Sequence, residues 1–359
     1  MTTRPLVLAL AALSTSLATA ASAAAPEGLA ANGEGCAAHL TAAAPQDVKI
    51  GNRAATSTGS RLTFKDAAPG GKLVLGVLGP INEDSGQNLF VLKRYLQFFK
   101  EQGVQVVVVS GDTGEVASGI QRALEAVADS GVPVLAVAGN RECGTDFKKG
   151  LERAQKTHAN LVNMNVVRAV ELKEATVVSL PGYHDPNFIS CATGCRYDKG
   201  TLDEVVKAAK ESKSPVILLS HGPPKGAGNK ALDYAVNGGN VGDAEINKAI
   251  AAAGITFGIF SNIKEAGARA TDLEGTALVP QDKPVKALFL NPGPADSTRW
   301  EMNDKTPGYG FAATLTINGK EASWKLYKSA KLTKEEKAEA HKMDPPKHRD
   351  EGEDSEGTP

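Results

Sequence analysis

The sequence has no excess of basic residues. Its 359 residues carry 40 Lys and Arg against 41 Asp and Glu, which gives a formal net charge of -1. A protein built around a nucleic-acid backbone or an anionic membrane surface needs a surplus of positive charge. The composition therefore argues against nucleic acid and against an anionic membrane as partners.

Long apolar runs are absent after the first 25 residues, so no later segment is long enough to span a bilayer. The first 23 residues have the pattern of an export signal, with Arg4, an apolar run over residues 6–17 and small residues at 21–23. We expect cleavage near Ala23 and a soluble protein that is secreted or periplasmic. A retained N-terminal anchor is the alternative, and the shortness of the apolar run disfavours it.

Cysteine is scarce, with four residues in the chain: Cys36, Cys143, Cys191 and Cys195. Four cysteines fit an oxidising compartment and allow three disulfide pairings. Because Cys191 and Cys195 lie four positions apart, we predict a local bridge between them and a second bridge from Cys36 to Cys143. A zinc site is the weaker alternative, since the spacings match no zinc-knuckle pattern and no histidine follows closely.

Buried strands alternate with amphipathic helices in the middle of the chain. Strands are expected at residues 73–78, 104–109 and 134–138, with helices at 86–102 and 116–130 between them. This order requires parallel strands joined by right-handed crossover helices. Further helices are expected at 145–156, 202–212 and 244–253, and further strands at 166–170, 175–180, 216–219, 255–260, 287–291, 310–317 and 322–327, with Asn318-Gly319 as a hairpin turn.

Two flanking segments lie outside this alternation. In residues 24–70, short strands at 47–50 and 61–64 are expected to form a hairpin. Residues 331–359 are rich in charge and lack an apolar period, which predicts a disordered tail. The predicted organisation is a signal peptide at 1–23, an N-terminal segment at 24–70, one α/β domain at 71–330 and the tail.

Four predicted strands end at polar residues. Four valines at 106–109 lead into Ser110-Gly111-Asp112, and later strands end at Asn140, His221 and Asn262. Ligands of open α/β sheets bind at the carboxyl ends of the strands. We therefore expect these polar side chains to meet at one edge.

The order of these motifs resembles that of the calcineurin-like metallophosphoesterase family. The resemblance rests on Gly111-Asp112, Gly139-Asn140 and His221 with its Gly-Pro-Pro continuation, and it extends over about residues 73–292. It implies a sandwich of two mixed β-sheets flanked by helices, and a site whose two metals hydrolyse phosphate esters. Two divalent ions about 3.5–4 Å apart clamp the attacking and leaving oxygens of such a reaction.

The sequence departs from the family pattern at several ligand positions. Pro80 and Asn82 occupy the first Asp-x-His motif, and Arg141 stands where the family has a histidine that assists the leaving group. Asn262 and Lys264 replace two further histidine ligands. The whole chain has six histidines, too few in the domain for a full dinuclear site of this kind.

The resemblance implies that the ligands of one metal are retained. They are Asp112, Asn140 and His221, with Asn262 as a weak fourth ligand, and they suit zinc, manganese or iron. The ammonium of Lys264 is expected to replace some of the charge of the lost second metal. Arg141 offers a planar fork for phosphate or carboxylate.

Each candidate also has a structural interpretation. Asp112 could cap a helix, Asn140 could hold a turn, and His221 could be a buried histidine with no ligand. Arg141 and Lys264 could form surface ion pairs with Glu142 and Glu265, and Glu115 is expected to be a helix first-turn acid. Asn82 and His184 are further candidate ligand-binding residues, His184 because the family places its turn near the site.

Two principal hypotheses follow. The first is an exported metallophosphoesterase homologue with a degenerate metal site that binds a small phosphorylated or anionic ligand and hydrolyses it weakly or not at all. The second is an active phosphoesterase with a single divalent metal, in which Lys264 and Arg141 stabilise transition-state charge and His221 or His184 handles protons. A structural or interaction domain is the third. Loss of the second metal's ligands favours the first, and the direction in which Lys264 and Arg141 point discriminates between the first two.

Overall fold

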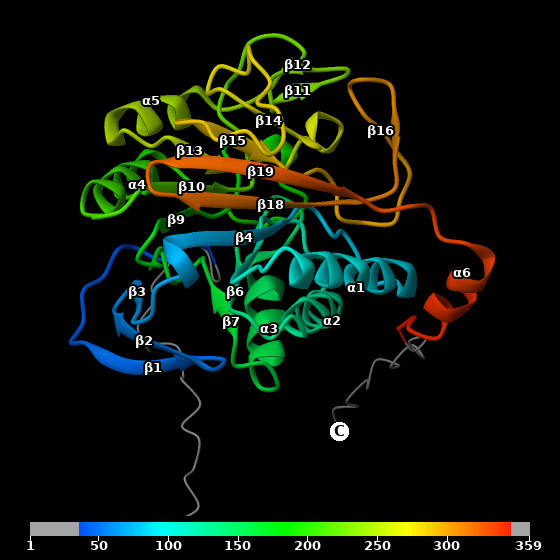
Figure 1. Cartoon of the computed structure of the whole chain (residues 1–359), viewed down its shortest axis with the longest axis horizontal. Coiled ribbons are helices and arrows are strands. Elements are labelled where there is room, and N and C mark those ends of the chain that lie inside the picture. Colours follow the sequence, from blue (N-terminus) through cyan, green and yellow to red (C-terminus); the bar gives the residue numbers. More distant parts are fainter. Residues whose placement is uncertain (1–35, 346–359) are drawn as a thin grey trace, which may run out of the picture.

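A computed structural model describes residues 36–345. The expected signal peptide and the end of the tail lie outside these residues. Two β-sheets pack against each other, and helices cover their outer faces (Figure 1). Within the described part of the chain, none of the helices is long and apolar enough to cross a membrane.

The first sheet has six strands in the order β19-β18-β4-β5-β6-β7. Its strands are β4 (Lys72–Leu78), β5 (Val106–Val109), β6 (Val134–Ala136), β7 (Leu161–Asn163), β18 (Phe311–Asn318) and β19 (Glu321–Lys328). Strands β4 to β7 are parallel neighbours, as the alternation of strands and helices predicts, while β18 and β19 are antiparallel.

The second sheet has nine strands in the order β1-β2-β3-β8-β9-β10-β13-β15-β14. Its strands are β1 (Gln46–Ile50), β2 (Arg53–Thr58), β3 (Arg61–Phe64), β8 (Ala169–Glu171), β9 (Thr176–Leu180), β10 (Val216–Ser220), β13 (Phe257–Ile259), β14 (Arg269–Thr271) and β15 (Leu288–Asn291). Two small ribbons pair β11 (Tyr234–Ala235) with β12 (Gly239–Asn240) and β16 (Trp300–Glu301) with β17 (Pro307–Gly308).

Helices lie on both outer faces. The six-stranded sheet is covered by α1 (Gly86–Glu101), α2 (Ala117–Ala128) and α3 (Gly144–Gln155), and the nine-stranded sheet by α4 (Lys199–Lys210) and α5 (Ala244–Ala253). The mixed two-sheet α/β sandwich expected from the resemblance is confirmed.

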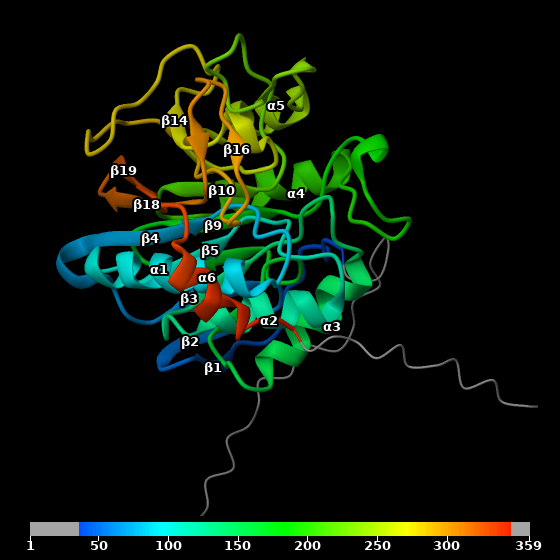
Figure 2. The ribbon, with the colours of Figure 1, turned by 90° about the vertical axis from the view of Figure 1, so that its right-hand side faces the viewer.

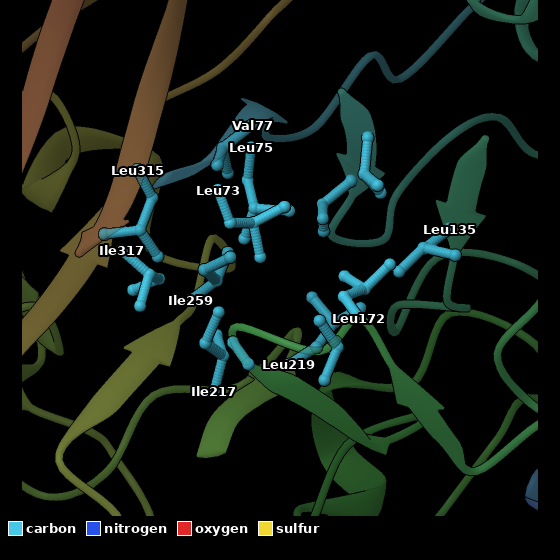
Figure 3. Close-up of a cluster of buried hydrophobic side chains, with 14 of the residues drawn as sticks. Leu73, Leu75, Val77, Leu135, Leu172, Ile217, Leu219, Ile259, Leu315 and Ile317 are labelled. Carbon is cyan, nitrogen blue, oxygen red and sulfur yellow. The ribbon is translucent and has the colours of Figure 1, made fainter. Parts of the chain in front are cut away.

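The run of four valines in β5 shows why the sandwich forms. Val106 and Val108 point into the core between the sheets, whereas Val107 and Val109 pack against the helices. Successive side chains of a strand point to opposite faces, so a strand buried on both faces is apolar throughout. Figure 3 shows the core between the sheets, where side chains of the six-stranded sheet meet those of the nine-stranded sheet, among them Leu73, Leu75, Leu315, Ile217, Leu219 and Ile259.

Two expectations for the flanking segments are wrong. Strand β2 was not expected; β1 pairs with β2, and β2 with β3, so residues 46–64 form a three-stranded meander instead of one hairpin. The predicted disorder of the tail is corrected by helix α6 (Lys334–His341), which packs beside α1 (Figure 2). Arg94 of α1 pairs with Glu336, and Asp344 Oδ1 accepts the backbone N–H of Gly86 at 2.7 Å. These contacts add to the helix-forming composition of α6 and to its capping box, which joins Thr333 and Glu336.

The predicted disulfide pairing is also wrong. Cys36 is bonded to Cys195, and Cys143 to Cys191. Cys191 and Gly194 form a local turn that lies beside the start of α3, where Gly194 pairs with Cys143. Cys191 and Cys195 therefore bond to different partners, Cys143 and Cys36, because the turn between them lies between α3 and the N-terminal segment.

Candidate functional site

Strand ends from both sheets meet at one rim of the sandwich. Asp112 follows β5 and Asn140 follows β6 of the six-stranded sheet, whereas His221 follows β10 of the nine-stranded sheet. All three side chains are buried. The predicted meeting of these polar residues is present, and it joins the two sheets.

The Asp112 carboxylate is the centre of the rim. Its Oδ1 accepts the backbone N–H groups of Asn140 and Arg141 at 3.2 and 3.1 Å and lies 3.2 Å from His221 Nε2. Its Oδ2 lies 3.4 Å from the Nζ of Lys264. Burial opposes ionisation of Asp112, but the charges of His221 and Lys264 outweigh it and hold the pKa of Asp112 well below its ordinary value.

His221 faces acceptors on both sides of its ring. Nδ1 lies 2.9 Å from the carbonyl oxygen of Ser110, and Nε2 lies 2.9 Å from Asn140 Oδ1. The Asn140 amide nitrogen donates elsewhere, to the Phe188 carbonyl. Burial disfavours the charged ring, but the Asp112 carboxylate outweighs it and raises the pKa of His221. Acceptors thus face both ring nitrogens, an arrangement that favours the protonated ring, which can donate from both of them.

Lys264 points into the rim. It begins the 3-10 helix η3 (Lys264–Ala266), and its side chain is 12% exposed. The ammonium also lies 5.6 Å from the centre of the Trp300 ring, within range of a cation–π contact. It pairs with Asp112 and not with Glu265, so the surface ion pair considered for it is excluded.

A second carboxylate approaches Lys264 from the loop after β15. Asp296 accepts the indole N–H of Trp300 at 2.8 Å and the side-chain amide of Asn82. Asn82 has a left-handed φ of 66°, and its buried Oδ1 has no hydrogen-bond partner. Burial raises the pKa of Asp296, while its hydrogen bonds and the charge of Lys264 oppose the rise. Asn82, Asp296 and Lys264 thus form a polar cluster beside Asp112.

Glu142 joins the two loops of the six-stranded sheet. Its carboxylate is fully buried and accepts the backbone N–H of Thr113 and, at 2.9 Å, that of Gly139. Burial and the negative charge of Asp112 raise the pKa of Glu142 to about 7. This residue positions the Asp112 loop against the Asn140 loop and is not a surface ion-pair partner of Arg141.

The remaining candidates contribute less to this arrangement. The guanidinium of Arg141 pairs with Glu115 and is 37% exposed, so the side chain points along the surface while its backbone binds Asp112. The Asn262 side chain hydrogen-bonds the hydroxyl of Tyr183. His184 stacks on Tyr183, with ring centres 4.6 Å apart, and has no described contact with Asp112.

Sequence reasoning missed Asp296, Glu142 and the hydroxyl of Ser261, which donates to the Ser110 carbonyl at 2.8 Å. A signal existed for Asp296, because the strand at 288–291 also ends in a polar loop, Asn291-Pro292-Gly293-Pro294. The rule that polar residues at strand ends mark the site, applied to four strands, would have added the end of this fifth strand. No comparable local signal marks Glu142, because an acid just before a helix is common on protein surfaces.

Gly111 allows the close contact between the sheets at this rim. Its φ is 99°, and a Cβ here would lie 2.6 Å from His221 Nδ1 and 2.8 Å from the Gly139 Cα. We predict that Gly111→Ala lowers the free energy of unfolding by about 2–4 kcal/mol, through backbone strain and overpacking. Urea denaturation measures the loss.

The matched control is Gly103→Ala, which has the same class of backbone conformation, φ 68°, but open space around its Cβ. We expect it to cost only about 1 kcal/mol. Equal losses in the two variants would show that His221 and Gly139 do not approach Gly111 so closely.

The buried groups of the rim predict a pH dependence of stability. The pKa of Glu142 is about 7 in the fold, against about 4.3 in an unfolded chain. The folded protein therefore binds the extra proton, and this stabilisation is complete below about pH 4 and lost as the pH rises to about 7. The raised pKa of His221 acts in the same direction, since its contribution is lost as the pH rises through its folded-state value.

We accordingly predict that the free energy of unfolding falls between about pH 5 and pH 8. Urea titrations at several pH values test this, and Glu142→Gln should flatten the decline below about pH 7. A free energy of unfolding that rises across this range would contradict the charge assignment.

Comparison with known proteins agrees with this geometry. Residues 84–246 match the family model described as calcineurin-like phosphoesterase. This match identifies a calcineurin-like phosphoesterase domain over residues 84–246 of the chain. No curated protein matches the chain. Members of this superfamily usually bind divalent metals.

Solved structures share the fold at low sequence identity. One crystal structure is 14% identical with a TM-score of 0.52, and the alignment covers 72% of this chain and 100% of the other. A dimetal phosphatase from Danio rerio is 13% identical with a TM-score of 0.43, covering 72% and 99% of the two chains. GAP50, the anchor in the inner membrane complex of Plasmodium, is 13% identical with a TM-score of 0.44, covering 76% and 93%. At these identities the likeness concerns the fold alone.

The donor atoms fit one divalent ion better than two. Asp112 Oδ1, Asn140 Oδ1 and His221 Nε2 converge, and the contact from His221 Nδ1 to the Ser110 carbonyl fixes the ring as in many metal sites. A second ion would have no comparable group of donor atoms, because Asn82 binds Asp296 and the Lys264 ammonium lies beside Asp112. In residues 36–345, no group of three or more His, Cys, Asp and Glu is placed to hold a metal.

Proposed function

We propose that this chain is an exported calcineurin-like phosphoesterase homologue with a degenerate metal site, which binds a small phosphate-type anion and hydrolyses it weakly or not at all. The observation that carries the proposal is the position of Lys264, whose ammonium lies 3.4 Å from Asp112 Oδ2. A fixed positive charge beside this carboxylate replaces part of the charge of a second metal. It cannot activate a water molecule as a metal ion does.

The state of His221 supports the same proposal. His221 Nε2 faces both Asp112 Oδ1 and Asn140 Oδ1, so a hydrogen on this nitrogen satisfies two buried acceptors without a metal. The rim is therefore internally neutralised by a proton and an ammonium. Lys264, which is partly exposed at the rim, would attract an anion, while Glu142, with a pKa of about 7, carries only part of a negative charge at neutral pH.

An active phosphoesterase with one divalent metal is the second candidate. The convergence of the Asp112, Asn140 and His221 donor atoms favours it. A bound metal would act as a Lewis acid toward a phosphoryl oxygen. Lys264 would orient the phosphate, and the backbone N–H groups at Asn140 and Arg141 would hold the carboxylate in place. No described side chain near Asp112 is a well-placed general acid, which disfavours this candidate.

Export is part of the proposal. Its support is the signal-like pattern of residues 1–23, which lie outside the described part of the chain, and the two cysteine pairs within bonding distance. Mass spectrometry of the protein recovered from culture medium or periplasm tests it, with cleavage near Ala23 as the expected result.

The deciding experiment measures the metal content of the purified mature protein together with hydrolysis of p-nitrophenyl phosphate and bis-p-nitrophenyl phosphate in added manganese or zinc. We predict substoichiometric metal and no metal-dependent turnover. Inorganic phosphate should raise the thermal midpoint of the native protein and have a much smaller effect on Lys264→Gln. The matched control is Lys248→Gln on α5, whose side chain is 72% exposed and pairs with Glu245.

Other outcomes separate the alternatives. About one metal per chain, with turnover lost in Asp112→Ala and His221→Ala, would establish a mononuclear phosphoesterase and overturn the proposal. No metal, no turnover and no response to phosphate would leave a structural or interaction domain.

A further inference from the structure

A cavity of about 700 Å³ lies beside the segment that follows η3, and Asp112 does not line it. It is bounded by β14, the last strand of the nine-stranded sheet, and β19, the last strand of the six-stranded sheet, with the β16–β17 ribbon beside it (Figure 1). Cavities of about 300–1,000 Å³ are typical of small-molecule sites. The place where the two sheets end side by side is therefore hollow enough for a ligand.

The lining of this cavity is basic. It contains Lys230, Arg269 and Lys328, and its one acidic residue is Asp304. Asp304 Oδ1 already accepts the N–H and hydroxyl of Thr306. None of the three basic side chains has an ion pair among the described residues. The charge of Asp304 acts on Arg269 and Lys328 but offsets only part of the three positive charges, and a bound anion would offset more.

Arg269 is held in place without a carboxylate. Its Nη1 donates to the carbonyls of Asn229 and Lys230 at 3.1 and 3.4 Å, and the rest of the guanidinium has no hydrogen-bond partner among the described residues. Arginine binds phosphate and carboxylate groups through two parallel N–H bonds. A half-buried fork held by backbone carbonyls is prepared for such a group.

Lys328 faces the same hollow because of its position in β19. Alternate residues of this strand share a face, and Ala322 and Trp324 of that face belong to the core between the sheets. Leu326 and Lys328 continue this face to the cavity. Lys328 thus lies on the core-facing side of β19, at the end of the strand beyond the core residues.

The other walls offer contacts for an organic group. Leu278 is 52% exposed, and Met302 and Leu326 also line the cavity. Asn303 has a buried Oδ1 with no hydrogen-bond partner, while its Nδ2 donates to the Tyr234 carbonyl at 2.8 Å. Apolar walls with a few polar groups are the usual composition of a ligand pocket.

We propose that this cavity binds a small organic anion, with its phosphate or carboxylate group on Arg269 and Lys328 and its organic part against Leu278, Met302 and Leu326. The site is separate from the rim at Asp112 and does not depend on the function proposed there. Segment 264–269 connects the two, because Lys264 points to the rim and Arg269 to the cavity.

The test is calorimetric titration of the full mature protein at low ionic strength with glucose 6-phosphate and glucuronate, using glucose and inorganic phosphate as comparisons. We expect one of the two organic anions to bind better than both comparisons. The double variant Arg269→Gln with Lys328→Gln should weaken binding about tenfold or more, since a charge-assisted hydrogen bond contributes about 1.5–3 kcal/mol. An unchanged urea midpoint confirms that this variant folds.

Lys264→Gln and the surface variant Lys248→Gln separate the cavity from the rim. Binding that persists in both and weakens only in the double variant supports the cavity, whether or not the rim binds phosphate. Binding lost in Lys264→Gln but retained in the double variant would assign the anion to the rim and overturn the inference. Failure of both organic anions to bind would overturn it as well.

Discussion

Asp112→Asn is expected to lower the free energy of unfolding by about 3–5 kcal/mol. Asp112 is 1% exposed and faces the charged His221 and Lys264, so the amide would leave two buried or half-buried cations without their counter-ion. Removing one partner of a buried charge cluster costs more than the cluster itself contributes, because the desolvated charges remain. Urea denaturation at neutral pH measures the loss.

The ionisation of His221 provides a second measurement on the same variant. In Asp112→Asn the ring stays buried but loses the carboxylate that raises its pKa, so the pKa of His221 should fall. Titration of the ring by nuclear magnetic resonance follows this directly. A stability loss without the pKa change would indicate a packing defect instead of a broken charge cluster.

Glu115→Gln is the matched control for this prediction. Glu115 is also an acid paired with a cation, Arg141, but its side chain is 59% exposed. An exposed pair contributes about 0–1 kcal/mol, so the control should lose little. Similar losses in Asp112→Asn and Glu115→Gln would contradict the burial and pairing of Asp112.

Removal of the Cys36–Cys195 bridge, by Cys36→Ser with Cys195→Ser, is expected to cost about 5 kcal/mol. The bridge closes a loop with a sequence separation of 159, and the entropy of an unfolded chain with so long an open loop is large. The Cys143–Cys191 bridge closes a shorter loop, with a sequence separation of 48. Its removal by Cys143→Ser with Cys191→Ser should lower the free energy of unfolding by about 4 kcal/mol. Oxidised proteins are compared by urea denaturation.

The shorter bridge should also affect the rim. It ties the start of α3 to the loop whose Phe188 and Ser190 bind the side chain and backbone of Asn140. We expect Cys143→Ser with Cys191→Ser to weaken the phosphate response, whereas loss of the longer bridge should leave it intact where the variant is folded. Peptide mapping under non-reducing conditions checks the pairing itself, and a Cys191–Cys195 peptide would contradict it.

Local patterns predicted much of the fold. The helical period at residues 86–102 and 244–253 predicted α1 and α5, and the run of apolar residues at 106–109 predicted β5. These patterns depend on neighbours one to four positions away, and the burial of one face or both follows from them. The parallel order of β4, β5 and β6 follows because crossover helices join them.

The gathering of site residues was predictable for the same reason. Asp112 and Asn140 follow β5 and β6, neighbouring parallel strands that end at a common edge. His221 follows β10 of the other sheet, and the packing of the two sheets brings it to the same rim. The role of each residue in binding or catalysis is not settled by that position. Lys264 was expected near Asp112 only through the family resemblance, since nothing in its local sequence distinguishes it from a surface lysine.

The sequence by itself determined most of the core strands and helices and which polar residues stand at their ends, because local periodicity and turn chemistry specify them. Only the tertiary structure decided the disulfide pairs, the packing of α6 against α1 and the roles of Glu142 and Asp296. Each of these depends on which distant segments pack together: α6 on α1, the cysteine loop on α3, and the loop after β15 on Asn82. Such contacts close loops of many residues, and no local pattern specifies their partners.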